Sequence, residues 1–212
     1  MFRHLFAGLL VLSLLLGPRP APAQTASAPA APEAAPRAGE RKPQTRPSVT
    51  RVAVDLQALD VDDGDTASIR WPGGDTESVR ILGIDTPETR HVAHDLPYAQ
   101  AFGAEARGFA MGVFAAATKV ELLRSSTTDP YGRTLGYFFV NGMNYSVLVV
   151  KARLAEETVS KYGDNGLPEP AAEVAAAAKQ AGPVPFESPG DYRRRMRAVS
   201  NWMKGKGISP ED

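Results

Sequence analysis

Three short stretches of the chain combine acidic and basic side chains with turn-forming residues. They are Asp63-Gly64-Asp65-Thr66, the run from Arg80 to Thr89, and Asp129-Pro130-Tyr131-Gly132-Arg133. Each stretch alone has a structural explanation as a turn or a helix start, because Asp-Gly, Asp-Pro and Asp-Thr-Pro are common there. Together they supply more carboxylates and arginines than turns require, so we consider what chemistry they could perform.

The side chains of these stretches match the needs of phosphodiester hydrolysis: an activated water, a cation on the phosphoryl oxygens, and donors for the charge of the transition state. Asp65 and Asp85 are hard oxygen ligands, which suit Ca²⁺ or Mg²⁺ rather than zinc in a chain without cysteine. Arg80 and Arg133 carry the planar guanidinium that binds phosphate through two N–H groups. Glu88 adds a further carboxylate. These residue types indicate metal-assisted phosphodiester hydrolysis.

Short β-rich segments separated by turns must position these residues. The expected strands are apolar or alternating runs bounded by turn residues, over 51–59, 67–71, 78–84, 119–123 and 135–140. Helices are expected where the pattern changes to Ala-rich or amphipathic, over 100–118, 145–154, 171–180 and 191–204. Five short strands with two or three helices predict a five-stranded β-barrel of the OB type, with Greek-key connections and helices capping it.

The spacing of Arg80 and Asp85 places a condition on the strand that carries them. Side chains five residues apart on one straight strand point to opposite faces of the sheet. For both to reach one site, we expect either a bulge at Gly83 or a strand that ends at Ile84.

The composition favours one globular domain. The chain has 212 residues, of which 43% are hydrophobic and 23% charged, which excludes full disorder and a polytopic membrane protein. Its 24 Lys and Arg balance its 24 Asp and Glu, so any surface that binds a polyanion must be local. The absence of cysteine excludes disulfides and thiolate chemistry.

The N-terminal segment has the pattern of an export signal. A basic start, an apolar run over 5–16 and a small-x-small end predict a signal peptide over 1–23, too short in its apolar part to span a membrane. Residues 24–48 are rich in Ala and Pro and carry no larger apolar side chain, which predicts a disordered linker. We therefore expect a folded domain over 49–207 in a secreted or periplasmic protein.

The three stretches make the chain resemble the staphylococcal nuclease-like (thermonuclease) family, closely over about 50–162 and loosely in the last helix. The resemblance implies an OB fold and a Ca²⁺-dependent endonuclease that cleaves DNA and RNA, single strands preferred, to 3′-phosphate products. It implies that the ion is held by Asp65, Asp85 and the carbonyl of Thr86. It also implies a catalytic trio of Arg80, Glu88 and Arg133, in which the glutamate accepts a proton from the attacking water.

Other features differ from the family pattern. The pair of tyrosines near the nucleotide is reduced to Tyr162, and residues 164–190 resemble an insertion before the last helix. Tyr131 and Tyr162 are the candidates for stacking on bases. A basic run on the last helix consists of Arg193, Arg194, Arg195 and Arg197. It is interpreted as a solvated face, with contact to a nucleic-acid backbone as the alternative.

An alternative is a noncatalytic OB-fold module that binds nucleic acid, because OB barrels bind oligonucleotides and a fold does not determine function. The carboxylates weigh against a pure binder, since they repel phosphate unless a cation intervenes. We expect a monomer that has no membrane contact after removal of the signal peptide.

Overall fold

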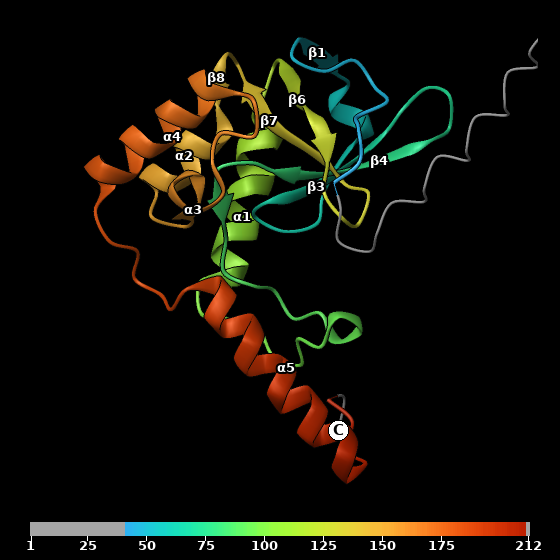
Figure 1. Cartoon of the computed structure of the whole chain (residues 1–212), viewed down its shortest axis with the longest axis vertical. Coiled ribbons are helices and arrows are strands. Elements are labelled where there is room, and N and C mark those ends of the chain that lie inside the picture. The colour runs from blue at the N-terminus through green and yellow to red at the C-terminus, as the bar shows by residue number, and fades with distance from the viewer. Residues whose placement is uncertain (1–40, 211–212) are drawn as a thin grey trace, which may run out of the picture. The chain divides into compact units, whose positions relative to one another are not determined.

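The computed structural model describes residues 41–210, and their central feature is a curled β-sheet (Figure 1). The predicted signal peptide and most of the predicted linker lie outside the described residues. The strand order is β1-β6-β7-β4-β3-β2, with β8 paired to β7, and β5 and β9 form a separate two-stranded ribbon. Only the contact between β4 and β7 in this sheet is parallel.

The strands are short, as the turn-rich sequence predicts. Their bounds are β1 Arg51–Val54, β2 Leu59–Val61, β3 Thr66–Arg70, β4 Thr76–Ile81, β5 Ile84–Asp85, β6 Val120–Thr128, β7 Thr134–Val140, β8 Met143–Asn144 and β9 Glu156–Glu157. The single strand expected over 51–59 is two strands, because Asp55 accepts a hydrogen bond from the backbone of Gln57 and starts a 3₁₀ turn between them. The curled sheet with its helices confirms the predicted class of barrel plus helices.

Four of the helices among the described residues lie close to their predicted positions, and the short α3 was not expected. The helices are α1 Gly103–Ala115, α2 Tyr145–Lys151, α3 Val159–Tyr162, α4 Pro168–Ala181 and α5 Pro189–Lys206. Proline at the start of α4 and glycine just after its end explain why the Ala-rich run is helical between those two residues. Among residues 41–210, no helix combines the length and the apolar character that a bilayer crossing requires.

The main core lies between α1, α2, α4 and the sheet. Ala106, Ala110 and Phe114 form the buried face of α1. The ring of Phe114 lies 5.4 Å from that of Phe138 on β7 and 5.1 Å from that of Tyr145 on α2, measured between centroids. These aromatic contacts pack α1 and α2 against the sheet whose strands carry the candidate site residues.

A buried ion pair anchors β4 to its neighbours. Arg124 on β6 donates two hydrogen bonds of 2.8 Å to Glu77 on β4, which also accepts one from Thr134. Burial by itself would raise the pKa of Glu77, but these hydrogen bonds hold it below its usual value. The carboxylate therefore stays charged and fully bonded, and it fixes the strand on which Arg80 lies three residues further along.

The segment before β1 pairs with the sheet. The backbone of Gln44 donates to Ser126, and the backbone of Thr128 donates to Lys42, each at 2.8 Å. Val49 donates similarly to Arg124 at 2.9 Å. The expected linker ends at residue 48, yet the described residues 42–48 include backbone groups that pair with β6.

This pairing leads to a prediction about truncation. A chain that begins at Arg41 should keep the free energy of unfolding of the chain that begins at Gln24, because every contact described above is retained. A chain that begins at Ser48 loses the backbone hydrogen bonds at Lys42 and Gln44, the ion pairs of Arg46 with Asp75 and Glu77, and the hydrogen bond from Arg124 to the Pro47 carbonyl. Its free energy of unfolding should fall by at least about 1–3 kcal/mol. Urea unfolding of the three chains measures this. Loss of folding in the chain beginning at Arg41 would contradict the prediction.

Candidate active site

Asp65, Arg80 and Asp85 meet at one place, although three different elements carry them. Asp65 immediately precedes β3, Arg80 lies on β4 and Asp85 ends β5. One Nη atom of Arg80 forms an ion pair with Asp65, and the other donates to Asp85 at 2.9 Å. The two carboxylate side chains are only 4% and 9% exposed. Arg80 thus bridges two buried carboxylates.

A turn at Gly83 makes this convergence possible. Strand β4 ends at Ile81, Gly83 has a φ of +81°, and β5 then starts at Ile84. A β-carbon at Gly83 would strain this conformation and would lie 3.1 Å from the hydroxyl oxygen of Tyr137. The structure shows neither a bulge at Gly83 nor a strand that ends at Ile84: β4 ends at Ile81, and a turn at Gly83 separates it from β5, which carries Asp85.

The loop before β3 is held against Thr86. The backbone N–H of Thr86 donates to Asp65 Oδ2 at 2.9 Å, and the backbone N–H of Asp65 donates to Asp63 Oδ1 at 2.9 Å. Burial raises the pKa of Asp63, and the charges of Arg80 and Arg133 act in the opposite direction. The structure therefore brings Asp65 into direct contact with the backbone of Thr86, while Arg80 joins Asp65 to Asp85.

Glu88 is positioned by the start of α1. Its backbone N–H donates to the side chain of Gln100 at 3.1 Å, and its carbonyl accepts from the Gln100 backbone at 2.8 Å. A β-carbon at Gly103 would lie 2.2 Å from the carbonyl oxygen of Glu88, so only glycine allows the helix to start there. The side chain of Glu88 remains 16% exposed.

A further cation, Arg193 of α5, lies in the site and was missed by sequence reasoning. It donates to Asp85 Oδ2 at 2.7 Å and to Asp85 Oδ1 at 3.0 Å, and it forms an ion pair with Glu88. The interpretation of the basic run as a solvated face is wrong for this residue, whose side chain is 30% exposed. The sequence pattern contained no signal that would have singled it out from its basic neighbours.

The two acidic partners of Arg193 differ in their electrostatics. Burial raises the pKa of Glu88, and the neighbouring charges of Asp85 and Asp63 add to this, while Arg193 opposes it. Burial would also raise the pKa of Asp85, but Arg193 and Arg80 hold it below its usual value. The two neighbouring carboxyls therefore have pKa values shifted in opposite directions, that of Asp85 lowered and that of Glu88 raised.

Arg133 and Tyr131 lie on the turn between β6 and β7. Arg133 Nε donates to Asp129 Oδ2 at 2.7 Å, so its ion pair is made within the turn. Its charge lowers the pKa of Asp63, against the effect of burial. Tyr131 is 86% exposed and its ring centroid lies 5.9 Å from the Arg133 guanidinium carbon.

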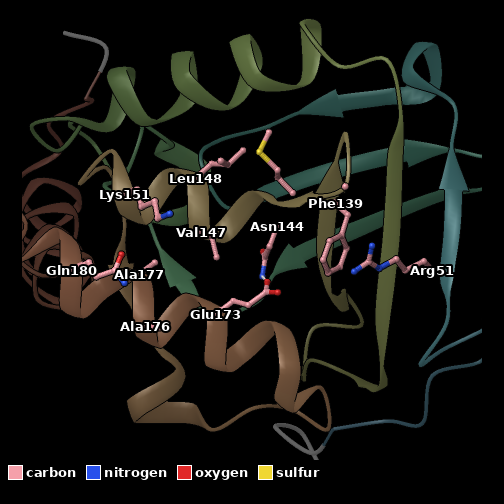
Figure 2. Close-up of a pocket in the computed structure, with 12 residues that line it drawn as sticks. Arg51, Phe139, Asn144, Val147, Leu148, Lys151, Glu173, Ala176, Ala177 and Gln180 are labelled. Atoms are coloured by element: carbon pink, nitrogen blue, oxygen red, sulfur yellow. Dashed lines mark hydrogen bonds between the residues drawn. The ribbon is translucent and has the colours of Figure 1, made fainter.

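A cavity of about 110 Å³ joins Arg80 to Tyr162. The two residues share its lining with the turn at Gly83 and with Thr158 and Asn165. Tyr162 is itself 58% exposed, so its ring is available beside the site. A second cavity, of about 390 Å³, lies between β7, α2 and α4 and contains none of the predicted site residues (Figure 2).

The donor set decides whether a metal ion suits this site. Within residues 41–210, no group of three or more His, Asp or Glu side chains is arranged to hold a metal ion. Asp65 and Asp85 nevertheless converge on one cation, Arg80, beside the backbone of Thr86. Hard oxygens of this kind fit Ca²⁺, provided that water and substrate complete the 6–8 ligands it takes.

Comparison with known proteins identifies the family. The model of the staphylococcal nuclease homologue family matches residues 78–182, from β4 to just past the end of α4. The matched range includes α4, while α5 lies beyond it. A search of curated proteins finds no significant match. Through the domain that contains Arg80, Asp85 and Glu88, the chain belongs to the staphylococcal nuclease homologue family.

Proposed function

We propose that the protein is an exported, Ca²⁺-dependent endonuclease that hydrolyses DNA and RNA to products with 3′-phosphates. Membership of the family indicates a nuclease-like or nucleic-acid-binding function. The observation that carries the finer proposal is the convergence of two buried carboxylates, Asp65 and Asp85, on Arg80, with Glu88 joined to the same cluster through Arg193.

Asp65, Asp85 and the carbonyl of Thr86 would hold the Ca²⁺ ion. When bound, the ion would supply Lewis-acid polarisation of a phosphoryl oxygen of the substrate. Asp65 and Asp85 are suited to this task because both are buried and one of them, Asp85, is kept ionised by its neighbours.

Glu88 would accept a proton from the attacking water. Its raised pKa brings it closer to working pH, and a carboxylate of intermediate basicity is a more effective proton acceptor than a strongly acidic one. Arg80 and Arg133 would donate hydrogen bonds to the charge that grows in the transition state. Arg133 would also assist the leaving oxygen. In the structure the N–H groups of Arg80 contact Asp65 and Asp85. Arg80 must therefore release part of these contacts before it can bind a phosphate.

Tyr162 and Tyr131 would stack on bases of the substrate. Both rings are exposed, and Tyr162 lines the cavity that contains Arg80. Stacking on an aromatic ring requires an unstacked base, which favours single strands. We propose that the protein acts as a monomer after export directed by residues 1–23, free of the membrane and secreted or periplasmic.

Incubation of the purified protein with single-stranded DNA and with RNA, with Ca²⁺ or with chelator, tests this function. Ca²⁺-dependent cleavage that leaves 3′-phosphates is expected, and end-group analysis of the products measures it. Binding of both nucleic acids without cleavage under any cation would instead identify the noncatalytic module.

A further inference from the structure

The helix α5, which lies beyond the family match, places a guanidinium on the carboxylates that the proposed function assigns to metal binding and proton transfer. We propose that Arg193 is a built-in competitor of Ca²⁺: it neutralises Asp85 and Glu88 in the ion-free protein, and α5 must withdraw it when the ion binds. This inference rests on the proposed Ca²⁺ site and adds a regulatory element to it.

The contacts of Arg193 engage both oxygens of Asp85. One Nη atom lies 2.7 Å from Oδ2, and the other lies 3.0 Å from Oδ1, which also accepts from Arg80 at 2.9 Å. A fork of this kind is the strongest arrangement that arginine makes with a carboxylate. A divalent cation bound at the same oxygens would lie beside a guanidinium, and at such short separation the two positive charges repel strongly. Arg193 and Ca²⁺ therefore exclude each other.

The balance of charge in the site explains why the positive charge of Arg193 stabilises the ion-free protein. Asp63, Asp65, Asp85 and Glu88 are four clustered acids; Arg80 pairs with two of them, and Arg133 is engaged by Asp129. Burying several carboxylates without enough positive charge is costly. Arg193 provides that charge when no ion is present, so it should stabilise the ion-free fold and weaken the binding of Ca²⁺.

The packing of α5 makes its withdrawal feasible. The buried apolar side chains Tyr192 and Met196 form a small cluster with Leu96 that is separate from the main core. In Figure 1 the helix runs away from the sheet and lies along the segment that precedes α1. The remaining contacts include a hydrogen bond from Ser200 and an ion pair from Lys204, both to Asp95. Elements with so little buried apolar contact open at lower free energy than the core does.

The neighbouring arginines supply a matched control. Arg194 pairs with Asp191 and Arg195 pairs with Glu187, both within or close to α5 and both largely exposed. Of the three consecutive arginines, Arg193 is the one that reaches the site carboxylates. Arg195→Gln therefore removes a similar charge from the same helix without touching the site.

The experiment compares the full chain with Arg193→Gln and Arg195→Gln by calorimetric titration with Ca²⁺ alone. We expect Arg193→Gln to bind the ion at least about 10-fold more tightly than the wild type, a coupling of ordinary size between two sites. Arg195→Gln should bind as the wild type does. Without the ion, Arg193→Gln should unfold at lower urea concentration than Arg195→Gln does.

Hydrogen exchange on the wild-type protein gives an independent result that needs no variant. The backbone amides of α5 should exchange faster with saturating Ca²⁺ than with chelator, whereas those of β6 and β7 should not change. Equal Ca²⁺ affinity in Arg193→Gln and wild type, or α5 exchange that is unaffected by the ion, would overturn the competition while leaving the proposed function intact. Failure of every protein to bind Ca²⁺ would refute the proposed metal site and the competition together.

Discussion

Arg80→Lys should lower kcat by at least about 10²-fold in a protein that still folds, which is the scale for losing one transition-state donor. Lysine keeps the positive charge between Asp65 and Asp85, so the buried carboxylates stay compensated. It lacks the planar fork that contacts two groups at once, and it is a point charge with a different reach. The chemical step should therefore suffer more than the stability.

Arg133→Lys should also lower kcat, because lysine lacks the planar fork; Arg133 lies on the turn between β6 and β7 and pairs there with Asp129. Arg70, exposed at the end of β3, is the matched control, and Arg70→Lys should keep normal kcat. Steady-state kinetics on single-stranded DNA separates kcat from KM, and urea unfolding checks the fold. A lysine variant at either site position with near-normal kcat would remove that arginine from the mechanism.

Local features of this site were predictable because they depend on short-range chain geometry. The parity of Arg80 and Asp85 required an interruption of the strand, and the turn at Gly83 supplies it. The bounds of α4 follow within a few residues from an Ala-rich run between proline and glycine. In both cases the sequence within about ten residues contains the physical cause.

Long-range pairings were not predictable in this way. Arg193 contacts Asp85 across 108 positions of the chain, and its neighbours in the basic run are the same residue type. An amphipathic pattern indicates that α5 has a buried side, but it does not say which surface covers that side. The docking of α5 on the segment around Leu96, rather than any local propensity, selects Arg193.

The pairing of residues 42–49 escaped prediction for a different reason. This segment joins β6 through backbone hydrogen bonds, which require no apolar side chain and no periodicity. A composition rich in proline and polar residues therefore looked like a linker, even though the backbone groups of Lys42 and Gln44 are paired.

Glu88→Gln should reduce the single-turnover rate by about 10²- to 10⁴-fold, the range for losing a general base, while Ca²⁺ binding changes little. The amide cannot accept a proton from water, and the side chain of Glu88 contacts Arg193 rather than Asp65 or Thr86. Because Glu88→Gln also weakens one contact of Arg193, the affinity for Ca²⁺ should rise slightly if it changes at all.

Asp65→Asn should give the opposite pattern, and this contrast separates metal binding from proton transfer. Asp65 is a charged oxygen ligand beside Thr86, so its loss should raise the Ca²⁺ concentration needed for half-maximal activity. At saturating Ca²⁺, Asp65→Asn should recover more of the single-turnover rate than Glu88→Gln does. Calorimetric titration with Ca²⁺ and a nonhydrolysable nucleotide, beside single-turnover kinetics on both variants, measures the two effects. If Glu88→Gln abolished ion binding while Asp65→Asn left it intact, the roles of the two carboxylates would have to be exchanged. The ion would then be bound by Glu88 and not by Asp65.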